Sequence, residues 1–250
     1  METLRERLSA ARSILFITGA GISADSGLPT YRGLGGLYEE KVTDEGIPIE
    51  EALSAQTFAR DPALTWKYIG EIEANTRGAK PNPAHAIIAE AERAKPRVWT
   101  LTQNIDGLHR AAGSQNLIEI HGDVHRLRCL RCGARRRLDD FSSIEIPPRC
   151  PKCGAIERPE VVLFGEMLPQ DDFATLEREL TSGFDAVISI GTTSVFPYIA
   201  QPVYRARMKG ALTVEVNPGH SQVSDIVEYR LRMRAATALE ALRDALLSSR

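Results

Sequence analysis

A glycine-rich segment that directly follows a short apolar run constrains the fold of this chain more than any other feature. The apolar run, residues 14–17 (Ile-Leu-Phe-Ile), predicts a buried strand. Gly19, Gly21 and Ala24 follow it with the G-x-G-x-x-G/A spacing of a phosphate-binding turn. In such a turn bare backbone approaches a pyrophosphate at the N-terminus of a helix. The sequence therefore predicts a strand followed by a nucleotide-binding turn.

The residues after these glycines make the pattern more specific. Asp25, Tyr31 and Arg32 supply a carboxylate, an aromatic ring and a guanidinium where a bound dinucleotide would lie. An ordinary dehydrogenase continues with a helix and a second strand that ends in an acidic residue. Residues 33–48 are instead rich in glycine and charge, so we expect a loop there. The alternative, a turn that binds nothing, is disfavoured because Gly, Ser, Asp and Arg are poor core residues.

Composition limits the number of domains and the classes of partner. A chain of 250 residues with 43% hydrophobic residues can form one large α/β domain with a small insertion. The formal net charge of −2 gives no electrostatic argument for nucleic-acid binding. We interpret the arginine clusters at residues 135–137 and 230–234 as solvated surface. The N-terminus has no signal-like apolar region and no apolar stretch reaches membrane-spanning length, so we expect a soluble, cytoplasmic protein without a membrane partner.

The cysteines have the spacing of a zinc ribbon, C-x2-C-x17-C-x2-C, formed by Cys129, Cys132, Cys150 and Cys153. Two tight turns of this kind complete a tetrahedral thiolate shell, which leaves no open position and predicts a structural metal. Gly133 and Gly154 follow the second cysteine of each pair, where the turn needs a positive φ. Disulfides are disfavoured without a secretion signal, and a redox site would need one pair alone.

Strand and helix signals alternate along the rest of the chain. This alternation predicts an α/β fold with a mostly parallel sheet that carries helices on both faces. We expect helices at residues 4–11, from Pro62, from Pro83, and at 171–180, 198–208 and 235–247. We expect strands at residues 14–17, 98–102, 117–120, 161–164, 185–190 and 212–216.

Polar residues gather where several of these strands end. They are Gln103-Asn104-Ile105-Asp106, His121-Gly122-Asp123, Gly191-Thr192-Thr193-Ser194 and Asn217-Pro218-Gly219. Any one group could be a capping turn, and His121 could be a hydrogen-bonded packing histidine. Open α/β sheets bind ligands at the carboxyl ends of their strands, so together these groups predict a crevice with phosphate and ribose partners and one histidine.

The chain resembles the sirtuins, the family of NAD-dependent protein deacylases. The matching residues are the glycine turn, Thr102 to Asp106 (T-Q-N-I-D), Ile120 to Gly122 (I-H-G), the four cysteines, Val161 to Glu166 (V-V-L-F-G-E), Gly191 to Ser194 (G-T-T-S) and Val216 to Pro218 (V-N-P). Small departures are Tyr31 where Phe is usual, Thr193 where Ser is common, and Asp123 after His-Gly.

The resemblance implies the domain organisation. A large Rossmann-like domain, residues 1–123 and 159–250, would bind NAD. A zinc-ribbon module, residues 124–158, would be inserted into it. Residues 33–80 would form a helical and loop insertion of the small domain, and NAD would meet an acyl-lysine protein or peptide between the two.

The resemblance also implies the reaction and the residues that carry it. The acyl-lysine carbonyl displaces nicotinamide from NAD, giving 2′-O-acyl-ADP-ribose and free lysine. His121 would be the general base for a ribose hydroxyl, aided by Asn104 and Asp106. The expected cofactor-binding residues are Gly19, Ala20, Gly21, Ser23, Asp25, Tyr31, Arg32, Gln103, Asn104, Ile105, Asp106, Gly191, Thr192, Ser194, Asn217 and Ala235. The expected substrate-binding residues are Val162, Phe164, Gly165 and Glu166, with residues 162–166 pairing with the substrate backbone as an added strand.

One further comparison within the family predicts which acyl groups the protein prefers to remove. Sirtuins that remove malonyl and succinyl groups carry a Tyr-x-x-Arg pair on a helix near the acyl pocket. The same register places Ile69 and Ile72 at those two positions here. An apolar wall suits uncharged acyl groups, because a carboxylate buried there would have no cationic partner. This helix could also be offset by a turn and not face the pocket.

Two other classes of function use the same NAD site. A protein mono-ADP-ribosyltransferase would transfer ADP-ribose to protein, which labelled ADP-ribose would reveal. A non-catalytic NAD-sensing zinc scaffold would bind NAD without turnover, and the presence of His121, Asn104 and Asp106 speaks against it.

Overall fold

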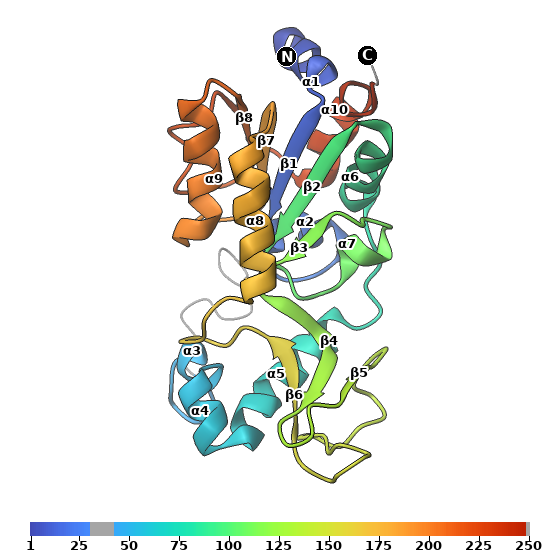
Figure 1. Cartoon of the computed structure of the whole chain (residues 1–250), viewed down its shortest axis with the longest axis vertical. Coiled ribbons are helices and arrows are strands. Elements are labelled where there is room, and N and C mark those ends of the chain that lie inside the picture. The colour runs from blue at the N-terminus through green and yellow to red at the C-terminus, as the bar shows by residue number, and fades with distance from the viewer. Residues whose placement is uncertain (31–42, 249–250) are drawn as a thin grey trace.

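The computed structural model describes residues 1–30 and 43–248, and its centre is a parallel sheet. Figure 1 shows this sheet in the upper half of the molecule. Its strand order is β3-β2-β1-β7-β8-β9. Neighbouring strands pair in parallel throughout. The strands are β1 (Ser13–Thr18), β2 (Arg97–Thr102), β3 (Leu117–Glu119), β7 (Ala186–Ile190), β8 (Leu212–Val216) and β9 (Tyr229–Leu231).

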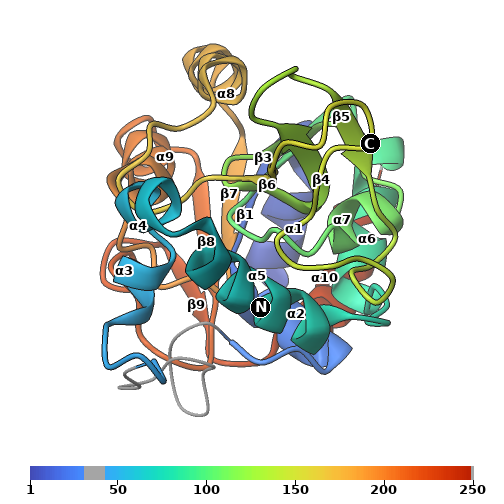
Figure 2. The ribbon, with the colours of Figure 1, turned by 90° about the horizontal axis from the view of Figure 1, so that it is seen from below.

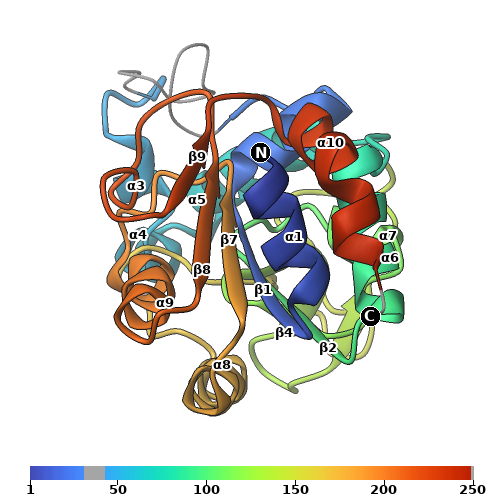
Figure 3. The ribbon, with the colours of Figure 1, turned by 90° about the horizontal axis from the view of Figure 1, so that it is seen from above.

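Helices cover both faces of this sheet, which confirms the predicted fold class. Ile14 and Phe16 of β1 pack in one apolar cluster with residues of α1 (Glu2–Ala10), α6 (Pro83–Ala94) and α10 (Ala235–Leu247). Leu15 and Ile17 point to the other face and pack with residues of α8 (Gln170–Ser182) and α9 (Pro197–Met208). Figure 3 shows α1 and α10 on one side of the sheet, and α8 and α9 on the other. Burial on both faces explains why β1 is a continuous apolar run.

The chain order creates a switch point at the middle of the sheet. From β1 the chain builds outward through β2 and β3, and later returns to the other side of β1 to build β7, β8 and β9. Loops at the carboxyl ends of β1 and β7 therefore leave the sheet in opposite directions and open a crevice between them. The short helix α2 (Ala20–Ser23) and the 3₁₀ turn η1 (Ala24–Ser26) follow β1 at this point.

A second, antiparallel sheet lies below the first in Figure 1 and is seen from below in Figure 2. Its order is β5-β4-β6, with β4 (Gly122–Cys129), β5 (Arg135–Arg137) and β6 (Glu157–Val161). It shares one apolar cluster with α3 (Ile49–Ala52), α4 (Ala55–Arg60) and α5 (Pro62–Thr76). Trp66 of α5 is fully buried there and donates its indole N–H to the Glu157 carbonyl at 2.9 Å. The division into domains at residues 123 and 159 stays a prediction.

Several local predictions are confirmed and one is wrong. Asp61 caps α5 and Asn82 caps α6, as the cap-then-proline patterns indicate. The strand predicted at residues 161–164 instead ends at Val161, because the next residues bond to a different partner. Phe164 donates its N–H to the Leu53 carbonyl and accepts from Ala55 N. Of the loop predicted at 33–48, residues 33–42 lie outside the described residues.

The described chain has one further short helix and no candidate for a membrane span. The helix, α7 (Leu108–Ala111), follows the polar residues at the end of β2. Within residues 1–30 and 43–248, no helix combines the length and the apolar character needed to cross a bilayer.

Candidate active site

Three glycines let the ends of β1 and β7 meet at the switch point. The Gly19 N–H donates to the Ile190 carbonyl at 3.1 Å, and the Gly21 N–H donates to the Gly191 carbonyl at 2.8 Å. A Cβ on Gly21 would lie 2.6 Å from the Gly191 Cα, and Gly191 has a φ of 58°. Neither position has space for a side chain, so bare backbone lines the crevice where α2 begins.

Two polar residues after β2 are bonded directly to this turn. Asn104 donates from Nδ2 to the Gly19 carbonyl at 3.1 Å and to the Ser23 hydroxyl at 3.2 Å. Ser23 in turn donates to Asp106 Oδ2 at 2.7 Å, and the Leu108 N–H donates to Oδ1 at 2.9 Å. Burial raises the pKa of Asp106, although both hydrogen bonds act against that rise. The structure therefore brings the predicted residues Ser23, Asn104 and Asp106 together.

His121 is partly buried, and both of its ring nitrogens are hydrogen-bonded. Nδ1 lies 3.1 Å from the Gln103 carbonyl oxygen, and Nε2 lies 2.7 Å from the Tyr198 hydroxyl. Since a carbonyl can only accept, Nδ1 carries the proton and the lone pair of the neutral ring is on Nε2. Burial lowers the pKa of His121, while the bond to Gln103 raises it. The ring is therefore neutral at pH 7 and has the form that a general base needs.

Aromatic side chains of α9 enclose this histidine. Phe196 and Tyr198 stack with ring centroids 5.4 Å apart, and both meet the imidazole edge to face at 5.8 and 5.9 Å. The motif analysis missed both residues. The sequence signal that could have pointed to them is the presence of two aromatic residues within four positions after Gly191-Thr192-Thr193-Ser194.

The loop after β7 links the predicted cofactor residues to one another. Gln103 donates from Nε2 to the Thr192 hydroxyl at 2.7 Å, and Asn217 donates from Nδ2 to the Thr192 carbonyl at 3.0 Å. Ser194 is buried with a φ of 54°, a backbone conformation that is rare for a residue with a side chain. Its hydroxyl is buried and has no hydrogen-bond partner among the described residues. An unsatisfied buried hydroxyl and a strained backbone both indicate a position adapted to a ligand.

The remaining predicted cofactor residues are in different situations. Asp25 accepts from the Ala236 N–H at 3.0 Å and pairs with Arg234 at 3.1 Å, so its carboxylate holds the N-terminus of α10. Ala235 is buried beside it. Ala20 opens α2, and Ile105 packs against the core of the lower sheet. Tyr31 and Arg32 lie outside the described residues.

Residues 162–166 connect His121 to the lower part of the molecule. The Val162 N–H donates to the His121 carbonyl at 3.0 Å, and Phe164 is bonded to the segment before α4. Glu166 accepts from Arg158 at 2.6 and 2.9 Å and from the Leu163 N–H at 2.9 Å. The Glu166 carboxylate therefore holds the segment in place, and Arg158 is a third residue that the sequence motifs do not include.

The predicted acyl-pocket residues lie close to this segment in the same apolar cluster. Ile69 and Ile72 of α5 are 2% and 8% exposed and pack in the cluster that contains Leu163, with Phe164 against it. The Tyr68 hydroxyl is turned toward the segment before α3, where it bonds to Glu45 and to the Asp44 N–H. Ile69 and Ile72 therefore belong to the same apolar cluster as Leu163, and neither brings a charge to it.

The four cysteines converge as predicted. Their sulfurs all lie within 4.8 Å of one another, with Cys129 and Cys153 at 3.4 Å and Cys132 and Cys150 at 3.7 Å. Gly133 and Gly154 have φ values of 69° and 72°, which confirms the turn geometry. Four thiolates at these separations fit a tetrahedral structural zinc.

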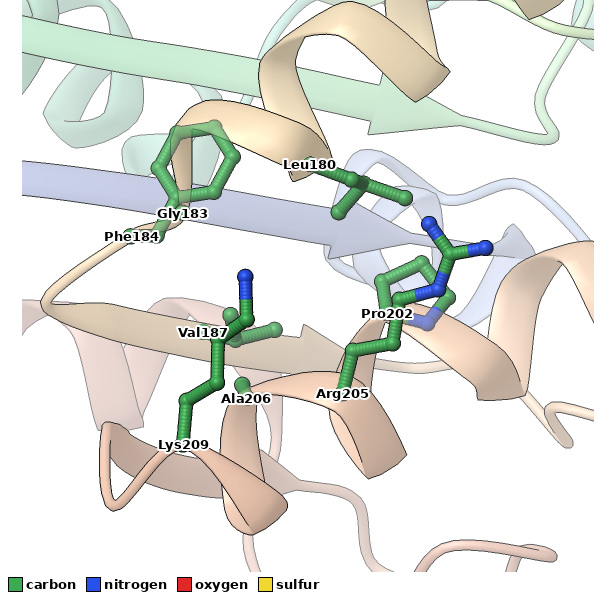
Figure 4. Close-up of a pocket in the computed structure, with 8 residues that line it drawn as sticks. All are labelled: Leu180, Gly183, Phe184, Val187, Pro202, Arg205, Ala206 and Lys209. Atoms are coloured by element: carbon green, nitrogen blue, oxygen red, sulfur yellow. The ribbon is translucent and has the colours of Figure 1, made fainter.

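A pocket elsewhere in the molecule is distinct from these residues. It lies between α8, β7 and α9 (Figure 4) and is lined by Leu180, Gly183, Phe184, Val187, Pro202, Arg205, Ala206 and Lys209. None of the residues that the motifs predict for the site lines this pocket. The bonded groups at the switch point, rather than this pocket, form the candidate active site.

Comparison with known proteins agrees with this arrangement. Residues 19–197 match the model of the Sir2 family. NAD-dependent protein deacylase 2 of Pseudomonas aeruginosa is 53% identical over 236 residues, which cover 93% of this chain and 92% of that protein. The NAD-dependent protein deacylase of Aquifex aeolicus is 37% identical and covers 94% of this chain and 95% of that protein.

Solved structures of Sir2 proteins have the same fold. A complex of a Sir2 homologue with NAD is 34% identical, has a TM-score of 0.87, and covers 98% of this chain and 93% of that one. A complex of Sir2 with a p53 peptide and NAD⁺ is 29% identical, has a TM-score of 0.82, and covers 98% and 97%. With the sequence motifs, the shared fold and these relatives in agreement, the chain belongs to the Sir2 family, the sirtuins.

Proposed function

We propose that this chain is an NAD-dependent protein-lysine deacylase that releases nicotinamide, 2′-O-acyl-ADP-ribose and deacylated lysine. The observation that carries the proposal is a neutral His121, with its lone pair on Nε2, placed beside Gln103 and the bonded group Ser23–Asn104–Asp106. The relatives named as NAD-dependent deacylases and the Sir2 complex with a peptide support it.

The residues at the switch point fit NAD. The bare backbone of Gly19 and Gly21 suits a pyrophosphate, and the buried, unpartnered Ser194 hydroxyl is a donor aimed at no protein group among the described residues. With Thr192 and Asn217 they would hold the nucleotide. When bound, NAD supplies a ribose whose anomeric carbon becomes cationic as nicotinamide leaves.

The residues around that carbon have two roles, stabilising positive charge and accepting a proton. Asn104 and Asp106 present amide and carboxylate oxygens, which suit a developing positive charge. His121 accepts the proton of a ribose hydroxyl at Nε2, while its Nδ1–H stays on the Gln103 carbonyl. Burial of the ring keeps it neutral, so the base is available at physiological pH.

Residues 162–166 are the proposed site of the substrate backbone. The N–H groups of Val162, Leu163, Phe164 and Glu166 are each bonded within the chain, and the carbonyls of Leu163 and Phe164 accept from the N–H groups of Glu166 and Ala55. The groups left for a peptide are therefore the Gly165 N–H and the remaining carbonyls of the segment. Gly165 has a φ of 85°, which turns this part of the segment away from regular strand geometry. We therefore expect a short strand addition with few backbone hydrogen bonds.

We further propose that the enzyme favours uncharged acyl groups. Ile69 and Ile72 face the apolar cluster that contains Leu163, where a succinyl carboxylate would lose its hydration without gaining a cation. Acetyl, propionyl and longer uncharged chains have no charged group whose hydration would be lost there.

The function is tested by replacing the base. His121→Ala should lower the steady-state rate of deacylation of an acetyl-lysine peptide by about a hundredfold or more, because the ribose hydroxyl loses its proton acceptor. His220→Ala, at an exposed position, is the matched control. Mass spectrometry of the products separates acyl-ADP-ribose from ADP-ribosylated protein. Turnover of His121→Ala within a few-fold of the unmodified protein would exclude His121 as the base.

The acyl preference is tested on one peptide that carries acetyl-, butyryl- or succinyl-lysine. We expect kcat/KM for succinyl-lysine to be at least about tenfold below the value for the acetyl form, because no cation meets the carboxylate. A preference for succinyl-lysine would show that α5 does not face the acyl group.

A further inference from the structure

The hydroxyl of Tyr198 occupies the one nitrogen of His121 that a general base can use. Nδ1 is committed to the Gln103 carbonyl, so Nε2 alone can accept a proton from a ribose hydroxyl. In this structure the Tyr198 oxygen lies 2.7 Å from Nε2. Burial raises the pKa of Tyr198 to about 12, so the phenol keeps its proton and donates it to Nε2.

The surrounding residues fix Tyr198 in this position. It lies in the first turn of α9, which begins with Pro197, and its ring stacks on Phe196 with an interplanar angle of 12°. The two rings and the imidazole form a packed group in which each aromatic ring meets His121 edge to face. The bond to Nε2 therefore follows from the packing of Phe196 and Tyr198, at the start of α9, against the His121 ring.

No neighbouring charge competes for the imidazole within the described residues. Asp106 is bonded to Ser23 and to the Leu108 N–H. Asp123 is fully buried, pairs with Arg137 and accepts from the His125 N–H. Among the described residues, Tyr198 is the ionisable side chain hydrogen-bonded to the His121 ring.

We propose that Tyr198 is a positioning residue for the base: its hydroxyl holds Nε2 of His121 in the resting protein and gives up that nitrogen when a ribose hydroxyl arrives. The inference rests on the proposed deacylase function, in which His121 is the base. On proton transfer the ribose O–H bond breaks, the N–H bond forms at Nε2, and the oxygen keeps the electron pair. The Tyr198 hydroxyl then has no acceptor on the ring and must turn to another partner.

The proposal predicts the direction of a pKa change. A hydrogen bond donated to Nε2 exists only with the neutral ring, so it favours that form and lowers the pKa of His121. Tyr198→Phe keeps the stacked ring and removes only the hydroxyl. We expect the proton affinity of His121 to rise about three- to tenfold, which is about 0.5 to 1 pKa unit. The acidic limb of the kcat/KM profile, which reports the free enzyme, should move to higher pH by the same amount.

The experiment measures both quantities in three proteins: the unmodified chain, Tyr198→Phe and Tyr204→Phe. Tyr204 is a matched control because it lies on the same helix, is 43% exposed and has its hydroxyl 3.4 Å from the Gln222 carbonyl. NMR titration of the nucleotide-free protein gives the pKa of His121, whose resonance is the one missing in His121→Gln. Steady-state rates on an acetyl-lysine peptide give the pH profile.

The outcomes separate this inference from the proposed function. A rise in both values for Tyr198→Phe, with Tyr204→Phe unchanged, supports the role of Tyr198. An unchanged His121 pKa and an unchanged profile in Tyr198→Phe would overturn it, while turnover by the unmodified protein would still uphold the deacylase assignment. Absence of turnover in the unmodified protein would overturn the proposed function. It would also overturn the role of Tyr198 as a positioning residue for a base, even if the NMR shift shows that the hydrogen bond exists.

Discussion

The glycines at the switch point are required because backbone atoms of the facing loop leave no space for a side chain. A Cβ on Gly21 would lie 2.6 Å from Gly191 Cα and 2.9 Å from the Gly191 carbonyl oxygen. Both contacts are with backbone, which cannot rotate away as a flexible side chain can. The glycines of the motif therefore do two things: they leave room for phosphate and they allow β1 and β7 to end against each other.

Gly21→Ala should consequently damage both folding and function. We expect the free energy of unfolding to fall by about 1–3 kcal/mol, as in other overpacked sites, and nicotinamide release to fall with it. Gly219→Ala is the control, because its added Cβ would lie 3.6 Å from Asn217 Oδ1 and the residue is exposed. Denaturant unfolding monitored by circular dichroism measures the difference. Equal stability of the two variants would show that the turn opens at little cost.

The sequence predicts residues of the site whose role follows from local spacing, and it misses those whose role follows from tertiary contact. Gly19, Gly21 and His121 could be found because glycine turns and polar strand ends are local patterns. The motifs did not include Tyr198 and Arg158, because their partners lie 77 and 8 residues away and only the packing of the chain brings them together. Asp25 illustrates the same limit, since its predicted cofactor role gave no hint that it also caps α10.

At the scale of elements, long apolar strands and capped helices could be predicted, whereas short charged strands could not. β5 consists of three arginines, which the sequence analysis assigned to solvated surface. In the structure each arginine pairs with a carboxylate of the same sheet: Arg135 with Glu160 and Arg136 with Glu157, both on β6, and Arg137 with Asp123 on β4. Glu157 and Asp123 are buried, so these pairs link β5 to the other two strands of its sheet although the arginines remain partly exposed.

The cysteine module is the element for which a metal should matter most. Its four sulfurs are close enough to need a cation to balance four thiolates. We expect about one zinc per chain by metal analysis. Removal by a chelator, or Cys150→Ala, should lower the melting temperature by at least about 5 °C and reduce activity together with stability. Lys152→Ala, in the same turn, is the control. A zinc-free protein that keeps its melting temperature and its activity would contradict a structural metal.

At the scale of the whole molecule, two histidines buried beneath the site make the fold sensitive to acid. His85 on α6 and His109 on α7 meet edge to face with ring centroids 4.8 Å apart, and His109 Nε2 lies 2.9 Å from the Thr18 hydroxyl. Burial lowers the pKa of His85 to about 4 and also lowers the pKa of His109. The unfolded chain, with a histidine pKa near 6.5, binds protons that the folded chain excludes.

The free energy of unfolding should therefore fall as the pH drops from about 6.5 toward 4. For His85 alone the loss between pH 7 and pH 5 amounts to about 2 kcal/mol, because the folded pKa is depressed and the unfolded chain takes up the proton first. Denaturant unfolding at the two pH values measures it. His85→Gln should show a smaller loss between them, whereas His220→Gln, at the surface, should behave like the unmodified chain. The same pH dependence in all three proteins would show that the acid effect arises elsewhere.

The strand order also determines when the site can come into being on a growing chain. β1 is made early, but the partner that completes its second edge, β7, follows much later; the bonds between Ser13 and Asp185 span 172 residues. On the ribosome β1, β2 and β3 can therefore pair first, while the other edge of β1 stays open and has to be kept from pairing wrongly. Gly191, which closes the glycine turn, is synthesised 172 residues after Gly19 (191 − 19). Nucleotide binding is thus a late event in biogenesis, and a chain truncated before β7 would lack one wall of its own cofactor site.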